Sequence, residues 1–307
     1  MRQPEVARLT RVLLALVLVL PVLRGAERLG VAAAFLIEFA DDRRPTLSAL
    51  TAAPVEQPRD LPDVAADRFT PRTLRTPTPL VLVPGATPEG KDDPRARRAA
   101  RLLARAGFDV TLPTIPGLTR GRLRPEDVTP VVVALRAAER PAVVVAVSVG
   151  SGPALLAAAD PRVRDRVALV LSLGGYASAP ELVRFYLTGA YGFGTETGHR
   201  HHDPVLVRAF VAANDDLLED PARLPALLEA LSPLRVAREI TAPVVLVHDR
   251  GDPVVPYTES LRLAAARPGT TLVLVDGLGH VDGAARGPRW GTLAGLWTAA
   301  YRLATAA

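Results

Sequence analysis

An α/β fold with a mostly parallel, doubly wound sheet is the fold class that this sequence predicts. Continuous apolar runs rich in β-branched residues alternate along the chain with helical patterns. Strands that are apolar on both faces need helices on both sides, which is typical of a parallel sheet covered on two faces. The clearest run, 142–147, ends at Ser148, and a helix begins near Pro153.

The other elements follow the same rhythm from residue 79 onward. Each expected strand is followed by a turn and then by a helix or an insertion. The expected strands are 80–83, 108–112, 142–147, 166–173, 242–248 and 271–275. The expected helices are 93–106, 125–140, a segment from 153, 258–266 and 290–304.

Residues 178–240 interrupt this rhythm. They contain three helical patterns, 181–187, 205–214 and 222–231, with no strand pattern between them. Ligands bind beyond the carboxyl ends of the strands in open α/β sheets. We therefore expect a helical lid insertion over that edge, within one large α/β domain at 79–307.

The N-terminal region differs in composition from the rest of the chain. Arginines precede an apolar run at 12–23, and a second apolar stretch covers 29–40. Neither run reaches the ~20 residues that span a bilayer, but both could lie in a membrane interface. We expect a hydrophobic helical arm at 1–42 that associates with a membrane surface and contributes no catalytic group. The alternatives are an arm packed on the body or on a partner chain, in a cytoplasmic protein.

Residues 43–78 are rich in Pro, Asp, Arg and Thr. This composition predicts a linker, with a weak edge strand near 65–70.

Composition limits the functional classes. The chain has 307 residues, 49% of them hydrophobic, and no cysteine, which excludes disulfides, a thiol nucleophile and cysteine-based metal sites. The net charge of +5 comes from arginines scattered beside acidic residues. Without a basic stripe and interleaved aromatics, we expect no nucleic-acid partner. We expect no cofactor and no metal, and nothing in the sequence indicates an oligomeric state.

A histidine cluster lies within the insertion. His199, His201 and His202 are adjacent rather than four residues apart, and Asp203 is the only carboxylate beside them. We therefore expect a solvent-exposed loop there rather than a metal site.

Ser148 has the surroundings of a nucleophile elbow. It lies at a strand–turn–helix junction, with Ala146 and Gly150 two residues to either side. Small side chains are needed there because strand and helix nearly touch around a strained turn. Ser151 is a rival whose neighbours at those positions are larger. The alternative is an ordinary turn in which Ser148 caps the next helix.

Two more polar residues follow strands of the same sheet. Asp252 follows the strand at 242–248, and His280 follows the last strand, which gives the order Ser, Asp, His. An imidazole can take the serine proton, and a carboxylate can orient the imidazole. Asp249 is an alternative acid, Asp252 could instead cap a helix, and His280 could be a surface residue.

From 79 to the C-terminus, the chain resembles the α/β-hydrolase superfamily, in its esterase and dienelactone-hydrolase-like range. The motifs are the elbow at 146–150, the acid loop at 251–256 and the Gly-His pair at 279–280. The resemblance implies Ser148 as nucleophile, His280 as base and Asp252 as acid, because the family's acid precedes the x-x-Val-Pro step.

The resemblance also implies an oxyanion hole made by the backbone N–H groups of Val149 and Ala86. One motif departs from the family pattern, because Pro84-Gly85 stands where the family usually has His-Gly. This change affects the expected shape of the hole, not its existence.

The predicted function is a serine hydrolase that cleaves a carboxylic ester or a related acyl substrate through an acyl-enzyme. Two alternatives use the same fold: a non-catalytic binding scaffold, and an acyltransferase that passes the acyl group to an acceptor other than water. The expected partner is a small-molecule ester, and aromatic and leucine residues at 182–193 favour an apolar pocket.

Overall fold

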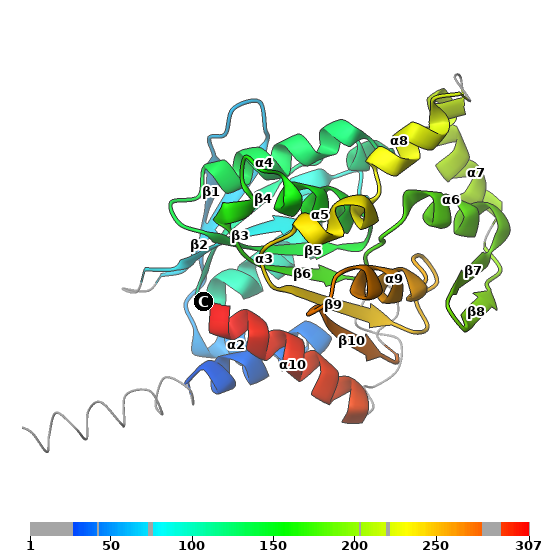
Figure 1. Ribbon diagram of the computed structural model, residues 1–307. Helices are drawn as coiled ribbons and strands as arrows, with labels where there is room; N and C mark the ends of the chain where they lie inside the picture. Colours follow the sequence, from blue (N-terminus) through cyan, green and yellow to red (C-terminus); the bar gives the residue numbers. More distant parts are fainter. Residues whose placement is uncertain are drawn as a thin grey trace, which may run out of the picture.

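The computed structural model describes residues 27–41, 43–72, 76–202, 204–218, 222–277 and 290–306. Its centre is an eight-stranded sheet in the order β1-β2-β4-β3-β5-β6-β9-β10 (Figure 1). The pairs from β4 to β10 are parallel, and β1 and β2 join antiparallel at one edge. The predicted mostly parallel sheet is therefore confirmed. The strands are β1 (Val55–Arg59), β2 (Ala66–Thr70), β3 (Thr78–Val83), β4 (Phe108–Pro113), β5 (Ala142–Val147), β6 (Val167–Leu173), β9 (Val244–Asp249) and β10 (Thr271–Val275).

Helices cover both faces of the sheet, as the strand composition requires (Figure 1). Along β5, Val144 and Ala146 face one core and Val143 and Val145 face the other. The first core is closed by α4 (Val128–Arg136), α5 (Ser151–Ala159) and α9 (Thr258–Ala266), and the second by α3 (Pro94–Arg105) and α10 (Trp290–Ala306).

The expectation of a linker at 43–78 is wrong. This stretch contains α2 (Thr46–Leu50), β1 and β2, and β2 matches the edge strand expected near 65–70. The pattern of β1 was hidden because its side chains are mostly exposed and include Pro58, as edge strands tolerate.

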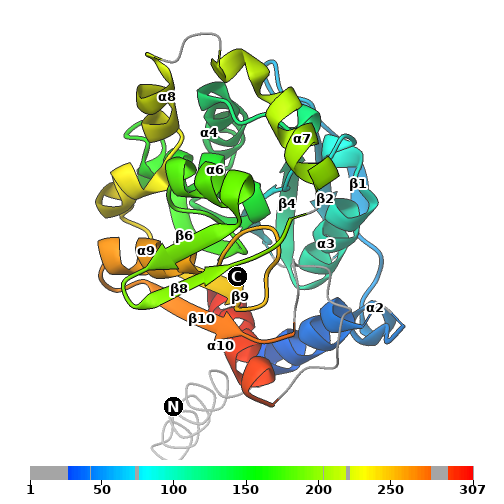
Figure 2. The same ribbon diagram turned by 90° about the vertical axis from the view of Figure 1, so that its right-hand side faces the viewer.

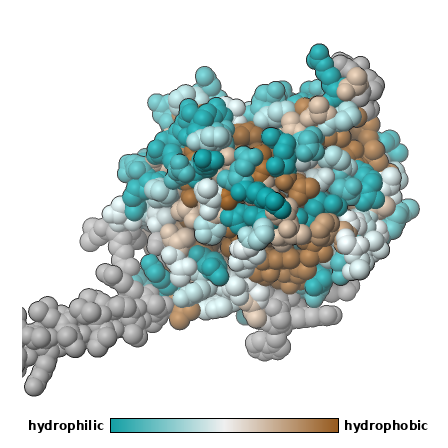
Figure 3. Space-filling model, viewed as in Figure 1, coloured by the Kyte–Doolittle hydropathy of each residue, from teal (hydrophilic) through white to brown (hydrophobic). Residues whose placement is uncertain are grey.

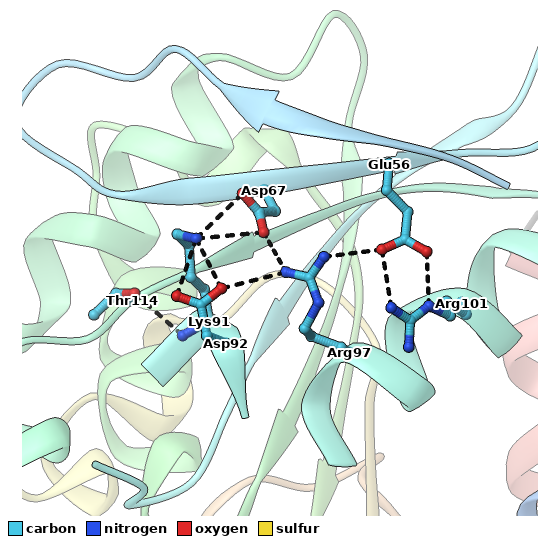
Figure 4. A network of polar contacts seen from close by, with 7 residues as sticks. All are labelled: Glu56, Asp67, Lys91, Asp92, Arg97, Arg101 and Thr114. Atoms are coloured by element: carbon cyan, nitrogen blue, oxygen red, sulfur yellow. Dashed lines mark hydrogen bonds and ion pairs between the residues drawn. The ribbon is translucent and has the colours of Figure 1, made fainter. Parts of the chain in front are cut away.

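Charged side chains hold this added edge to the body (Figure 4). Glu56 of β1 accepts hydrogen bonds from Arg97 and Arg101 of α3. Asp67 of β2 pairs with Arg97 and with Lys91.

On the side of the molecule shown in Figure 3, hydrophilic residues are spread between apolar ones rather than gathered in a stripe.

The described part of the N-terminal arm, 27–40, is a helix packed on the body. The guanidinium of Arg98 in α3 donates a 2.6 Å hydrogen bond to the carbonyl of Glu38. The Glu38 carboxylate accepts the Ser48 N–H at 2.8 Å, and the Thr46 hydroxyl bonds the carbonyl of Ala34 at 2.7 Å. Of the alternatives for the arm, packing on the body is therefore the one that holds for 27–40, which lies beside α10 in Figure 2. Residues 1–26 lie outside the described part.

None of the helices in the described ranges combines the length and apolar character needed to cross a bilayer.

The insertion at 178–240 contains the three expected helices and a hairpin that the sequence did not predict. The helices are α6 (Ala179–Thr188), α7 (Pro204–Ala213) and α8 (Leu224–Ala230), and the hairpin is β7 (Ala190–Phe193) with β8 (Glu196–His199). Figure 1 shows these elements grouped at the right-hand end of the molecule.

Glu259 of α9 anchors the start of the insertion. Its buried carboxylate accepts the N–H groups of Ala177 and Ser178 at 3.0 and 2.7 Å, and it pairs with Arg262. Burial raises the pKa of Glu259 above its usual value, and these bonds to the ionised form oppose that rise.

Candidate active site

Ser148 occupies a strained turn at the carboxyl end of β5. Its φ angle is +54°, and it begins a 3-10 turn, η4 (Ser148–Gly150), that leads into α5. Such a conformation costs a non-glycine residue roughly 1–3 kcal/mol and persists only where the surroundings impose it. This is the conformation that the elbow interpretation requires.

Two glycines allow the backbone to close around this turn. A Cβ atom added to Gly150 would lie 2.1 Å from the carbonyl oxygen of Pro84, so only glycine fits there. A Cβ atom on Gly85 would lie 3.2 Å from the Cβ of Ser148 and 3.7 Å from its Oγ. The turn after β3 therefore lies directly against the candidate nucleophile.

The rival Ser151 lies in the wrong place for a nucleophile. It is completely buried at the start of α5, and its Oγ accepts a 2.8 Å hydrogen bond from the Ser172 hydroxyl. A substrate cannot reach this hydroxyl without unpacking the sheet.

The candidate oxyanion donors share a cavity with Ser148. Ala86 and Val149 both line a cavity of about 940 Å³ that includes Ser148 and, from the acid loop, Pro253 and Val254. The structure thus brings three of the expected segments to one cavity: the turn after β3, the elbow and the acid loop. His280 lies outside the described residues; β10, which precedes it, pairs with β9 in the same sheet.

Asp252 is buried just beyond β9. Its Oδ1 accepts the N–H groups of Val254 and Val255 at 2.7 and 3.0 Å, which fixes the carboxylate in a tight turn. Asp249 is equally buried, and its Oδ1 accepts the Gly251 N–H at 2.5 Å. Burial therefore does not separate the two acids, although Asp252 directly precedes the two residues that line the cavity.

His248 supports the turn that holds Asp252, a role that sequence reasoning missed. Its Nε2 lies 2.9 Å from the Val255 carbonyl oxygen, and its Nδ1 lies 2.7 Å from the Ser260 hydroxyl. The carbonyl can only accept, so Nε2 carries a proton and donates it to this bond, while Nδ1 shares the second bond with the Ser260 hydroxyl. This role could have been inferred from the sequence, because His248 lies at the end of a predicted strand, four residues before Asp252.

Two isosteric substitutions test which carboxylate, Asp252 or Asp249, serves as the acid of the expected triad. Asp252→Asn keeps the oxygen that accepts the two backbone N–H groups but loses the charge, so we expect a roughly thousand- to ten-thousand-fold fall in kcat. Stability should fall slightly, by about 1–2 kcal/mol, because the new amide group replaces the oxygen that lies 3.6 Å from His248 Nε2. Asp249→Asn also keeps its acceptor oxygen, and we expect little change. Steady-state kinetics with thermal unfolding checks both variants, and a larger loss for Asp249→Asn would reverse the assignment.

Tyr186 and His202 from the insertion also line the cavity. Burial, followed by the charge of Asp252, raises the pKa of Tyr186, so it stays a neutral phenol. His202 lies against the rings of Phe185 and Tyr186, and its Nε2 lies 3.0 Å from the Phe185 carbonyl oxygen.

The other two histidines of the cluster lie apart from the cavity lining: His199 belongs to β8 and His201 is exposed. Across the described ranges, no group of three His, Cys, Asp or Glu side chains could hold a metal ion.

Comparison with known proteins agrees with this architecture. The model of the alpha/beta hydrolase family matches residues 80–286, and the chain belongs to that family. None of the curated protein sequences compared with it matches.

Solved structures share the fold at low sequence identity. The Pyrococcus horikoshii acylaminoacyl peptidase has a TM-score of 0.56 at 17% identity, over 81% of this chain and 41% of that chain. The 2,6-dihydroxy-pseudo-oxynicotine hydrolase has a TM-score of 0.54 at 20% identity, over 88% and 70%. A membrane phospholipase A, described as a novel bacterial virulence factor, has a TM-score of 0.51 at 17% identity, over 95% and 99%. This chain spans about two fifths of the peptidase's length.

Proposed function

We propose that this protein is a serine hydrolase that cleaves a carboxylic ester through an acyl-enzyme on Ser148. The observation that carries the proposal is the strained turn at Ser148, closed by Gly150 and opening into a large, mainly apolar cavity. A structural turn has no need of a serine at positive φ, whereas a nucleophile must stand clear of its own strand and helix.

The proposed reaction assigns one role to each residue. His280 takes the proton of Ser148 while the hydroxyl oxygen attacks the ester carbonyl. The N–H groups of Val149 and Ala86 stabilise the oxyanion. His280 then returns the proton to the leaving alcohol, and water releases the acid by the same steps. Asp252 orients the imidazole and stabilises its charged form.

The direct test is hydrolysis of p-nitrophenyl butanoate by the purified full chain, with the acid product quantified. We expect release of nitrophenol and free acid in equal amounts. Nitrophenol without free acid, in the presence of an alcohol acceptor, would indicate an acyltransferase. Faster cleavage of the matching anilide would indicate a peptidase, and no turnover of any acyl substrate would favour a binding scaffold.

We also propose membrane association through the N-terminal apolar run at 12–23. The basic residues before it favour an anionic lipid surface, and a similar fold that covers 95% of this chain is that of a membrane phospholipase A.

Two deletions test this proposal. We expect removal of residues 1–26 to shift the protein from the membrane pellet to the soluble fraction, with hydrolysis of a soluble ester retained. Removal of 1–42 also takes away the helix at 27–40 and its hydrogen bonds to the body, so stability should fall by about 2 kcal/mol or more. Full-length protein that stays soluble without detergent would contradict the membrane proposal.

A further inference from the structure

The cavity at Ser148 continues from the edge of the sheet down one of its faces. Val147, Leu173 and Val247 form a row across β5, β6 and β9 near the strand ends, and all line the cavity. Leu82, Val145 and Leu171 form the next row down the same face and also line it. The rows are two residues apart, about 7 Å along the strands.

Helices close this part of the cavity, which we call the sheet-face branch. Its lining includes Leu296 and Ala299 of α10, Ala99 of α3, and Phe35 and Phe39 of the helix at 27–40. The small alanine side chains leave room that larger residues would fill. The far wall is therefore the helix that directly follows the N-terminal apolar region.

The rest of the cavity has a different character. It is lined by the insertion, through Tyr186, His202 and Phe210, and by Arg120 and Arg122. Arg120 is exposed and Arg122 is partly buried, so this side meets solvent and carries charge. Charged residues also line the cavity at the start of α3, where Asp93 pairs with Arg95, and Arg98 bonds the Glu38 carbonyl. A polar leaving group suits this side, and the sheet-face branch suits an apolar chain.

We propose that the sheet-face branch holds the acyl chain of a long-chain ester, with the helix at 27–40 as its far wall. This inference rests on the proposed ester hydrolysis at Ser148. The cavity volume of about 940 Å³ is at the upper end of the ~300–1,000 Å³ usual for ligand sites, more than a short acyl group needs. Binding energy from the chain then positions the ester carbonyl at Ser148.

The first test is a series of p-nitrophenyl esters from butanoyl to hexadecanoyl. We expect kcat/KM to rise by up to roughly fourfold per methylene until the chain reaches the far wall. Ala299→Phe fills the branch, and we expect the hexadecanoyl-to-butanoyl ratio of kcat/KM to fall roughly a hundredfold, as for three to four lost methylenes. The matched control is Ala294→Phe on the exposed side of the same helix, which should leave the ratio unchanged.

Phe39→Ala gives a second variant in case Ala299→Phe does not fold. It lengthens the branch at a half-buried position, so the preferred chain length should increase. An independent readout is binding of a fluorescent fatty acid to Ser148→Ala protein, which requires no turnover. Affinity should fall at least about tenfold, as for two lost methylenes, when Ala299→Phe is added.

The outcomes separate this inference from the proposed function. One outcome is hydrolysis that depends on Ser148 but has the same chain-length profile in Ala299→Phe and Phe39→Ala as in the wild type. This outcome would overturn the inference and leave the hydrolase proposal standing. If the wild type hydrolyses none of the esters, the hydrolase proposal is overturned. Fatty-acid binding that Ala299→Phe weakens would then still support the branch as an acyl site, and unchanged binding would refute it.

Discussion

Ser148→Ala is expected to lower ester hydrolysis by four orders of magnitude or more, because it removes the atom that attacks the substrate. The protein should remain folded, since alanine and serine bear the same cost at the φ angle of +54°. Activity should be measured with butanoyl ester against a buffer blank, and folding by thermal unfolding. Turnover by Ser148→Ala well above that blank would show that the nucleophile lies elsewhere.

Two comparisons sharpen this result. Ser148→Gly is also expected to be inactive, but more stable than Ser148→Ala by about 1 kcal/mol, because glycine accepts positive φ without strain. The double variant Ser148→Ala/His280→Ala should lose no more activity than either single variant, because nucleophile and base act as one unit. Additive losses would mean that His280 acts independently of Ser148.

Gly150→Ala is expected to destabilise the whole domain by roughly 3 kcal/mol or more. Its added Cβ would lie 2.1 Å from the Pro84 carbonyl oxygen and 3.2 Å from that of Val83, and backbone atoms cannot move aside as a flexible side chain can. Denaturant unfolding measures the loss of stability, and activity should fall with the folded fraction.

Gly85→Ala tests the same close approach with a smaller clash, so its effect on activity can be measured in a folded protein. Its Cβ would lie 3.2 Å from the Ser148 Cβ and 3.4 Å from the Val147 carbonyl oxygen, so a shift of a few tenths of an ångström accommodates it. We expect a folded protein with at least about tenfold lower kcat, because small displacements of a nucleophile are costly. Gly30→Ala, where nothing lies within 4 Å of the added atom, is the control. Normal stability of Gly150→Ala would contradict the close approach of the two turns.

The sequence predicted the central sheet well because its strands are buried on both faces. Such strands, like 142–147, contain only apolar residues and stand out without any alignment. The strained turn at Ser148 was recognisable for a related reason: two nearly touching backbones restrict the residues around it, and that restriction is visible as Ala146 and Gly150.

The edge of the sheet was harder to predict. β1 is exposed and carries Glu56 and Arg59, so its sequence resembles that of a linker. Its ion pairs with α3 join residues about forty positions apart, and no local pattern indicates such pairing. The hairpin β7–β8 was missed for the same reason, because its side chains are at most half buried.

The helix at 27–40 shows a different limit. An apolar stretch interrupted by Glu38 fits both a membrane interface and a protein surface. The helix is attached to the body through partners that the sequence does not reveal, since the Glu38 carboxylate accepts the Ser48 N–H and the Glu38 carbonyl accepts a hydrogen bond from Arg98. The choice between Asp249 and Asp252 was also out of reach of the sequence. Both carboxylates are buried, and both accept hydrogen bonds from backbone N–H groups.

The most direct test of the account is covalent labelling of the full-length protein with a fluorophosphonate, followed by mass spectrometry of the modified peptide. A fluorophosphonate reacts with a serine that a neighbouring base activates. We expect one adduct on Ser148, and its loss in His280→Ala. An adduct on Ser151 or another serine, or no adduct on a folded protein, would contradict the assignment of Ser148 as an activated nucleophile.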